Sequence, residues 1–102
     1  MGLTQARATL IAALAGGTYQ HEPREAQEEK NLLAVGDVSP EEVIRLLNRC
    51  KGTQYSESTH HWAADVVVHL FEPEFGDETW YIKAYFLDEG DGTAVFISVH
   101  RS

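Results

Sequence analysis

Three runs of alternating apolar residues dominate the C-terminal half of the chain: Trp62–Phe71, Thr79–Leu87 and Thr93–His100. Alternation at a period of two predicts β-strands with one buried face and one exposed face. The predicted core face carries Ala64, Val66, Val68, Leu70, Trp80, Ile82, Ala84, Phe86, Val95, Ile97 and Val99. The opposite face carries Asp65, Val67, His69, Tyr81, Lys83, Tyr85, Phe96, Ser98 and His100. A merely solvated face would favour Thr, Ser and Glu, so this mixture indicates a functional surface.

Two helices are predicted in the N-terminal half. The first covers Leu3–Ala15, where alanines dominate, apolar residues recur every three to four positions and Gly16-Gly17 ends the pattern. The second begins at Ser39-Pro40-Glu41-Glu42, which offers an N-cap hydroxyl, a proline at the first helical position and a glutamate at the third. Its apolar stripe consists of Val43, Ile44, Leu46, Leu47 and Cys50. We expect this helix to pack across the core face of the sheet.

The segments between these elements are polar. Glu22–Lys30 is either a solvated helix that continues to about Val35 and stops at Gly36, or a mobile arm. Thr53–Tyr55 is a candidate edge strand, and Ser56–His61 is a polar connection into the strands. The order of elements predicts a single α+β domain over residues 1–102, with two or three helices on one face of a twisted antiparallel sheet.

Composition narrows the class of protein. The single Cys50 cannot form a disulfide within the chain, and the longest apolar stretch, Leu10–Ala15, is far too short to span a bilayer. We therefore expect a cytoplasmic protein with no membrane partner. The net charge is −8, and residues 51–102 hold nine carboxylates against three Lys and Arg side chains. This balance argues against DNA as a partner but is compatible with a compact site for one or two phosphates.

The sequence does not predict a metal site. Five histidines are present, but His60 and His61 are adjacent, and adjacent side chains on an extended chain point to opposite sides. The acidic stretch Asp88–Gly92 lacks the distal glutamate of an EF-hand loop, and its glycines are better explained by a hairpin turn. We expect neither a metal nor another cofactor.

The candidate chemistry lies on the last two strands. Matching their faces across a four-residue connection places Tyr81 opposite His100 and Lys83 opposite Ser98. A phenol, an imidazole and an ammonium group would then be close together, which is the inventory that metal-free RNA cleavage needs: a base, an acid and a cation for the phosphorane. The alternative is that these tyrosines and the lysine simply cover a half-exposed sheet.

The chain resembles the MqsR toxins of the RelE-like ribonuclease superfamily. The resemblance runs through Asn31–Ser58, with its Leu-rich stretch, Gly-Asp turn, apolar helix and Tyr-x-x-Ser ending. It continues through Trp62-Ala63-Ala64-Asp65-Val66, Trp80-Tyr81-Ile82-Lys83 and Phe96-Ile97-Ser98-Val99-His100. About two thirds of the chain is covered, by short motifs in the family order.

The resemblance implies endonucleolytic cleavage of mRNA without a metal, restrained by a cognate antitoxin. The family's tyrosine and the lysine after it match Tyr81 and Lys83, whereas its terminal lysine is His100 here. Its other catalytic lysine falls where Ser56-Glu57 stand, and its glutamine is Ala63. These departures leave either a histidine-based catalytic set that draws on His60 or His61, or a relative that has lost cleavage and kept the scaffold.

The chain is therefore interpreted as a toxin-like, metal-independent endoribonuclease, an mRNA interferase, whose partners are RNA and an antitoxin or another protein. The expected catalytic residues are Tyr81, His100, Lys83, His60 and His61. The residues expected to contact RNA are Tyr85, Ser98 and Arg101. The alternative is a non-enzymatic acidic protein-binding module, such as an immunity, antitoxin-like or phage-defence protein, whose carboxylate-rich loops meet a basic surface.

Overall fold

The computed structural model describes residues 2–23, 30–60, 63–88 and 92–101. The elements in chain order are α1 (Leu3–Gly16), β1 (Tyr19–His21), α3 (Pro40–Arg49), the 3₁₀ turn η1 (Gly52–Gln54), β2 (Tyr55–Thr59), β3 (Val67–Phe71), β4 (Glu74–Phe75), β5 (Glu78–Asp88) and β6 (Thr93–Arg101). Within the described ranges, no helix is both long enough and apolar enough to cross a membrane.

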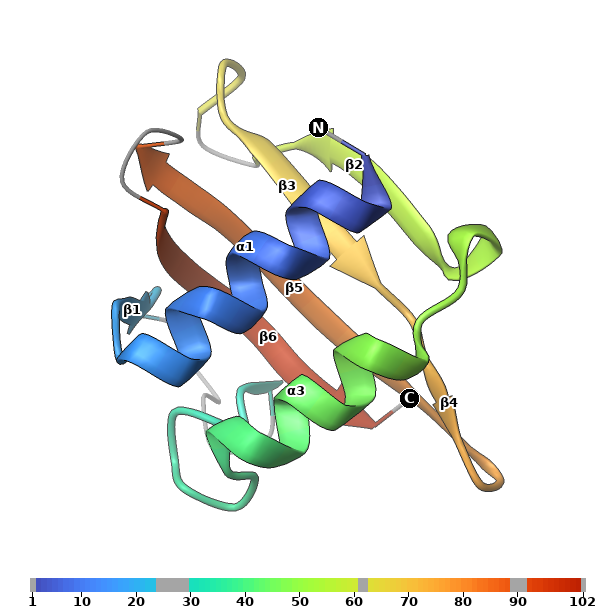
Figure 1. Cartoon of the computed structure of the whole chain (residues 1–102). Helices are drawn as coiled ribbons and strands as arrows, with labels where there is room; N and C mark the ends of the chain where they lie inside the picture. The colour runs from blue at the N-terminus through green and yellow to red at the C-terminus, as the bar shows by residue number, and fades with distance from the viewer. Residues whose placement is uncertain (1, 24–29, 61–62, 89–91, 102) are drawn as a thin grey trace.

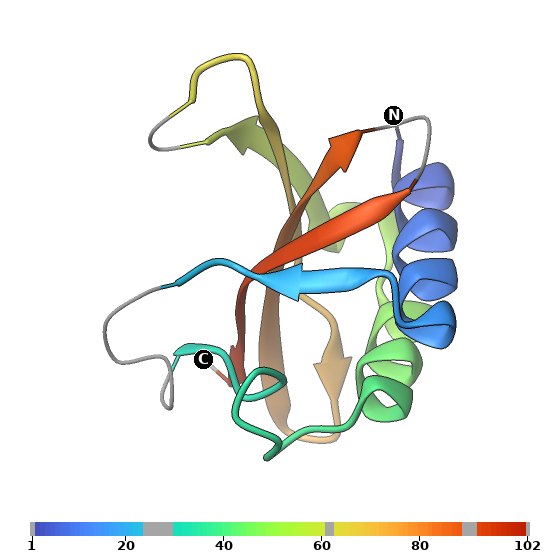
Figure 2. The same ribbon diagram turned by 90° about the vertical axis from the view of Figure 1, so that its left-hand side faces the viewer.

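The sheet has the strand order β1-β6-β5-β3-β2, with the short β4 paired to the start of β5. Its neighbours are antiparallel except β1, which pairs in parallel with β6. Both α1 and α3 lie on the same side of this sheet (Figures 1 and 2). The predicted α+β class, with helices on one face, is confirmed, and the sheet is mixed because of β1.

Both predicted helices are present at the predicted positions. α1 buries Ala6, Leu10, Ala13 and Leu14 and ends at Gly17, whose φ of 74° suits glycine. α3 begins with the full capping box: the Ser39 side chain accepts from the Glu42 N–H, and the Glu42 carboxylate accepts from the Ser39 N–H. α3 buries Val43, Leu46 and Leu47 against the sheet.

We call the face of the sheet that packs against the helices the covered face, which includes Trp80, Ile82 and Ala84 of β5. The other side is the open face, which includes Tyr81, Lys83 and Tyr85 of the same strand. At the C-terminal end of β6 the predicted register is confirmed, since Tyr81 pairs with His100, Ile82 with Val99 and Lys83 with Ser98.

The predicted faces of β6 are wrong in its N-terminal half. The register shifts between Lys83 and Ala84, so that Ala84 pairs with Phe96 and Ile97 is the extra residue of a β-bulge. A single extra residue exchanges the two faces, and Phe96 therefore joins the core while Val95 pairs with Tyr85 on the open face.

The predicted faces of β3 are also reversed. His69 pairs with Ala84 and Phe71 with Ile82 on the covered face, whereas Leu70 pairs with Lys83 on the open face. Val68 lies two residues before Leu70 on the same strand and therefore shares the open face. Residues 63–66 form a turn, closed by hydrogen bonds from the His60 N–H to the Val66 carbonyl and from the Val66 N–H to the Ala63 carbonyl. The alternation starts afresh at Val67, which leaves Ala64 exposed and Val66 half-buried, outside the core.

Other boundaries moved as well. The edge strand is Tyr55–Thr59. Of the expected strand Thr53–Tyr55, only Tyr55 is in a strand, because the two residues before it belong to the 3₁₀ turn, and most of the expected connection Ser56–His61 is a strand. The backbone of Asn31 bridges to Val99, and residues 32–36 after it form turns, not the expected end of a helix. The proposed helix or arm Glu22–Lys30 lies mostly outside the described residues. β1 was not predicted, because three residues are too few for a periodicity.

Candidate functional site

Tyr81 and His100 lie side by side on the open face, near the end of the β5–β6 pair. Their rings are stacked, with centroids 5.4 Å apart and planes inclined by 25°. Lys83 is the next residue of β5 on this face, opposite Ser98, which is buried. The structure thus brings together four of the site residues predicted from the sequence, and the predicted register of β5 and β6 is what places them side by side.

A backbone contact sets the proton arrangement of His100. Its Nδ1 lies 2.8 Å from the carbonyl oxygen of Arg101, and a carbonyl only accepts, so Nδ1 carries a hydrogen and donates it. In the neutral imidazole the lone pair is then on Nε2. The geometry therefore defines which nitrogen can take up a proton.

A second group of side chains meets on the open face around Tyr85. Glu22, from the segment after β1, places Oε1 2.7 Å from His60 Nε2 and accepts a 3.3 Å hydrogen bond from the Tyr85 hydroxyl. The His60 ring meets the Tyr85 ring edge-on at 5.0 Å. The His60 side chain is only 8% exposed. This group holds a carboxylate, an imidazole and a phenol in contact.

The electrostatics of Tyr85 keep its proton in place. Burial raises the pKa of the phenol, and the nearby Glu22 carboxylate raises it further, because both disfavour the phenolate. Tyr85 is therefore a hydrogen-bond donor at neutral pH. Glu22 was not nominated from the sequence, since its contacts with His60 and Tyr85 span 38 and 63 residues and no local pattern signals them.

One residue that was proposed from the sequence for RNA contact, Arg101, does not join this face. Arg101 pairs with Trp80 on the covered face, where its Nε forms a 2.8 Å ion pair with Glu78 and its guanidinium lies 4.7 Å above the Trp80 ring. Consecutive residues of a strand point to opposite faces, so Arg101 turns away from His100. His61 lies outside the described residues.

A third titratable cluster lies on the covered face, at the β2 edge. The Tyr55 hydroxyl is 2.7 Å from His69 Nδ1 and donates to Glu57 Oε2 at 3.0 Å. These contacts connect His69, Tyr55 and Glu57 by hydrogen bonds. Burial raises the pKa of Tyr55, and its hydrogen bond to Glu57 adds to the rise. His69 is 2% exposed and stacks on Tyr55, so this cluster pins β2 to β3.

Among the described residues, no group of three or more His, Cys, Asp or Glu side chains is placed to hold a metal ion. Cys50 is buried, and burial raises the pKa of its thiol, which disfavours the reactive thiolate.

Comparison of the chain with protein-family models, with curated proteins and with solved structures finds no match.

Proposed function

We propose that the open face cleaves RNA without a metal ion, as a toxin-like endoribonuclease. The observation that carries the proposal is the stacked Tyr81 and His100 pair with Lys83 beside it. Attack of a ribose 2′-oxygen on phosphorus requires an acid, a base and a cation, and these three side chains supply them. The sequence resemblance to MqsR toxins supports the same chemistry.

In the proposed reaction the neutral Nε2 of His100 takes the proton of the ribose 2′-OH. The 2′-oxygen attacks phosphorus, the Lys83 ammonium stabilises the negative phosphorane, and the bond to the 5′-oxygen breaks. Tyr81 orients the phosphate and gives its proton to the leaving 5′-oxygen, so that a 2′,3′-cyclic phosphate and a 5′-hydroxyl result. Proton transfer through water from the His100 imidazolium restores the Tyr81 phenol.

The Glu22, His60 and Tyr85 group serves the flanking nucleotides. Tyr85 follows Tyr81 by four residues on one strand, a separation of about 13 Å, which is too far for both to act on one phosphate. An aromatic ring at this distance is suited to stack on a neighbouring base. Tyr85 is therefore assigned to RNA contact. Ser98 and Arg101 are not, because Ser98 is buried and Arg101 faces the other side of the sheet.

The acidic chain gives RNA little long-range attraction, since its net charge is −8. A short single-stranded segment that contacts only the open face fits this charge better than a duplex. In the same proposal the cellular partner is a cognate antitoxin or another protein that controls access to this face, and the enzyme acts in the cytoplasm.

The test is RNA cleavage by purified protein that is free of any partner. We expect His100→Ala to lower the cleavage rate by roughly 10²–10⁴-fold, as loss of a general acid or base does. Arg101→Ala is the matched control, because it alters the neighbouring residue on the opposite face and should leave the rate nearly unchanged.

Failure would take a clear form. Wild-type protein that leaves mRNA uncut at neutral pH, with and without ribosomes, would refute the enzyme. The acidic protein-binding module would then be the better description of this chain. Equal rates for wild type and His100→Ala would instead refute the assigned base.

A further inference from the structure

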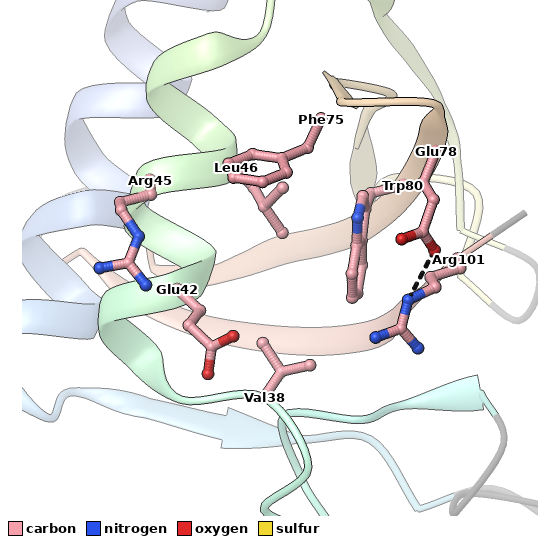
Figure 3. A pocket seen from close by; sticks show the side chains of 8 residues that line it. All are labelled: Val38, Glu42, Arg45, Leu46, Phe75, Glu78, Trp80 and Arg101. Atoms are coloured by element: carbon pink, nitrogen blue, oxygen red, sulfur yellow. Dashed lines mark ion pairs between the residues drawn. The ribbon is translucent and has the colours of Figure 1, made fainter.

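A pocket of about 210 Å³ lies between α3 and the β4–β5 hairpin, on the covered side of the sheet (Figure 3). It belongs neither to the open face nor to the proposed cleavage site. Its lining consists of Val38, Glu42, Arg45, Leu46, Phe75, Glu78, Trp80 and Arg101.

Four of the eight residues that line the pocket are apolar. Val38, Leu46 and Trp80 are 3%, 5% and 8% exposed, and they belong to the hydrophobic core. Phe75 stands over them as one wall and is 46% exposed, which is unusual for a large aromatic side chain. A cavity of about 150 Å³ lined by apolar side chains can hold benzene, so this pocket has room for one large apolar side chain.

An arginine lies on the ring of each aromatic side chain of the pocket. Arg49 lies 4.6 Å from the centre of the Phe75 ring, and Arg101 lies 4.7 Å from the Trp80 ring while it pairs with Glu78. These cation–π contacts restrict the two rings. The pocket is thus formed before anything binds, which lowers the entropy lost on binding.

The elements around the pocket are acidic. Residues 37–49 and 72–78 with Arg101 carry three arginines, and two of these lie on the aromatic rings. The carboxylates of the same elements are Asp37, Glu41, Glu42, Glu72, Glu74, Asp77 and Glu78. The charges that line the pocket itself balance, two carboxylates against two arginines, but the surrounding elements have an excess of negative charge, which favours a positively charged partner.

We propose that this pocket docks a basic polypeptide, which inserts one large apolar side chain between Phe75 and Trp80. Lysines or arginines on either side of that anchor face the surrounding carboxylates. The assignment is independent of RNA cleavage, because none of these residues faces the open side of the sheet.

The test is titration of the full chain with acetyl-KKLFKK-amide, followed by the NMR signal of the Trp80 indole N–H. We expect a saturable shift for the wild-type protein. The Phe75→Ser variant should bind the same peptide at least about tenfold more weakly than wild type, because it lacks one aromatic wall of the pocket. The peptide acetyl-KKSSKK-amide, which lacks the anchor, and the acidic acetyl-EELFEE-amide should each bind at least about tenfold more weakly. Leu87→Ser, which alters an exposed apolar residue elsewhere, should bind as wild type.

Two variants of the β4–β5 hairpin each remove one negative charge. Comparing them distinguishes direct contact of a carboxylate with the peptide from the effect of the protein's total charge. Phe75 pairs with Glu78, so both face the pocket, whereas Glu74 points to the other side. Glu78→Gln should weaken the basic peptide about threefold or more, and Glu74→Gln by less than about twofold. The proposal would be overturned if millimolar peptide gave no saturable shift. It would also be overturned if Phe75→Ser bound the basic peptide as tightly as wild type, or if the acidic peptide bound as tightly as the basic one.

Discussion

At the scale of single residues, Asn31 joins three separate parts of the molecule. Its side chain is 1% exposed, and its amide nitrogen donates to His21 Nδ1 at 3.1 Å and to the Phe96 carbonyl at 3.5 Å. Its Oδ1 accepts the Ala34 N–H at 3.1 Å. A buried amide with these partners links β1, β6 and the turn at 31–36, and it was not nominated from the sequence because no local pattern distinguishes it from a surface asparagine.

We expect Asn31→Ala to lower the free energy of unfolding by about 1–3 kcal/mol, because it leaves buried polar groups without partners. Denaturant unfolding measures the change. Asn48→Ala, at an exposed position of α3, is the control and should stay within about 0.5 kcal/mol of wild type. Equal stability of the two variants would show that the Asn31 contacts contribute nothing net.

His21 should make stability depend on pH. Burial lowers the pKa of His21 from its ordinary 6.5, and Nδ1 must stay unprotonated to accept from Asn31. Below pH 6.5 the unfolded chain then binds a proton that the folded chain resists, so the free energy of unfolding falls as the pH drops.

His21→Gln keeps an acceptor and removes the titration. We expect the midpoint temperature to fall less between about pH 7.5 and 5.5 in this variant than in wild type, since the unfolded state no longer gains that proton. Thermal unfolding at both pH values measures the difference. An identical or steeper fall in His21→Gln would contradict the assignment.

At the scale of elements, the alternation of apolar residues predicts the buried face of a strand correctly where the strand is regular. The prediction is wrong where a bulge or a turn shifts the alternation by one residue. The faces of β5 and of residues 98–100 in β6 follow from alternation alone, and with them the Tyr81 and His100 pairing. The extra residue Ile97 does not follow, because Ala94 to Val99 reads as apolar at nearly every position and fits either phase. Nor does the phase of β3, where Val66, Val67 and Val68 are all apolar.

The N-terminus of α3 allows a direct test of local structure. Ser39→Ala removes the acceptor for the Glu42 N–H and should lower the free energy of unfolding by about 1 kcal/mol. Ser39→Asp restores an acceptor and should recover most of the loss. Thermal or denaturant unfolding would detect both changes, and a Ser39→Ala variant as stable as wild type would mean that the cap is redundant.

At the scale of the whole molecule, the two sides of the sheet separate two kinds of surface. The open face gathers Tyr81, Lys83, Tyr85 and His100, while the covered side holds the core and the pocket beside α3. The first could be predicted, because it depends on the register of neighbouring strands. The second could not, since it requires α3, the β4–β5 hairpin and the end of β6 to meet.

The position of β6 bears on the order in which the protein is made. β6 lies between β1 and β5, and Tyr19 of β1 pairs with Ala94, 75 positions later in the chain. At synthesis rates of about 5–20 residues per second, β1 waits roughly 4–15 s for its only neighbour in the described sheet. The apolar side of α1 is also exposed until the strands behind it arrive. Folding of this sheet therefore has to wait until β6 has been synthesised.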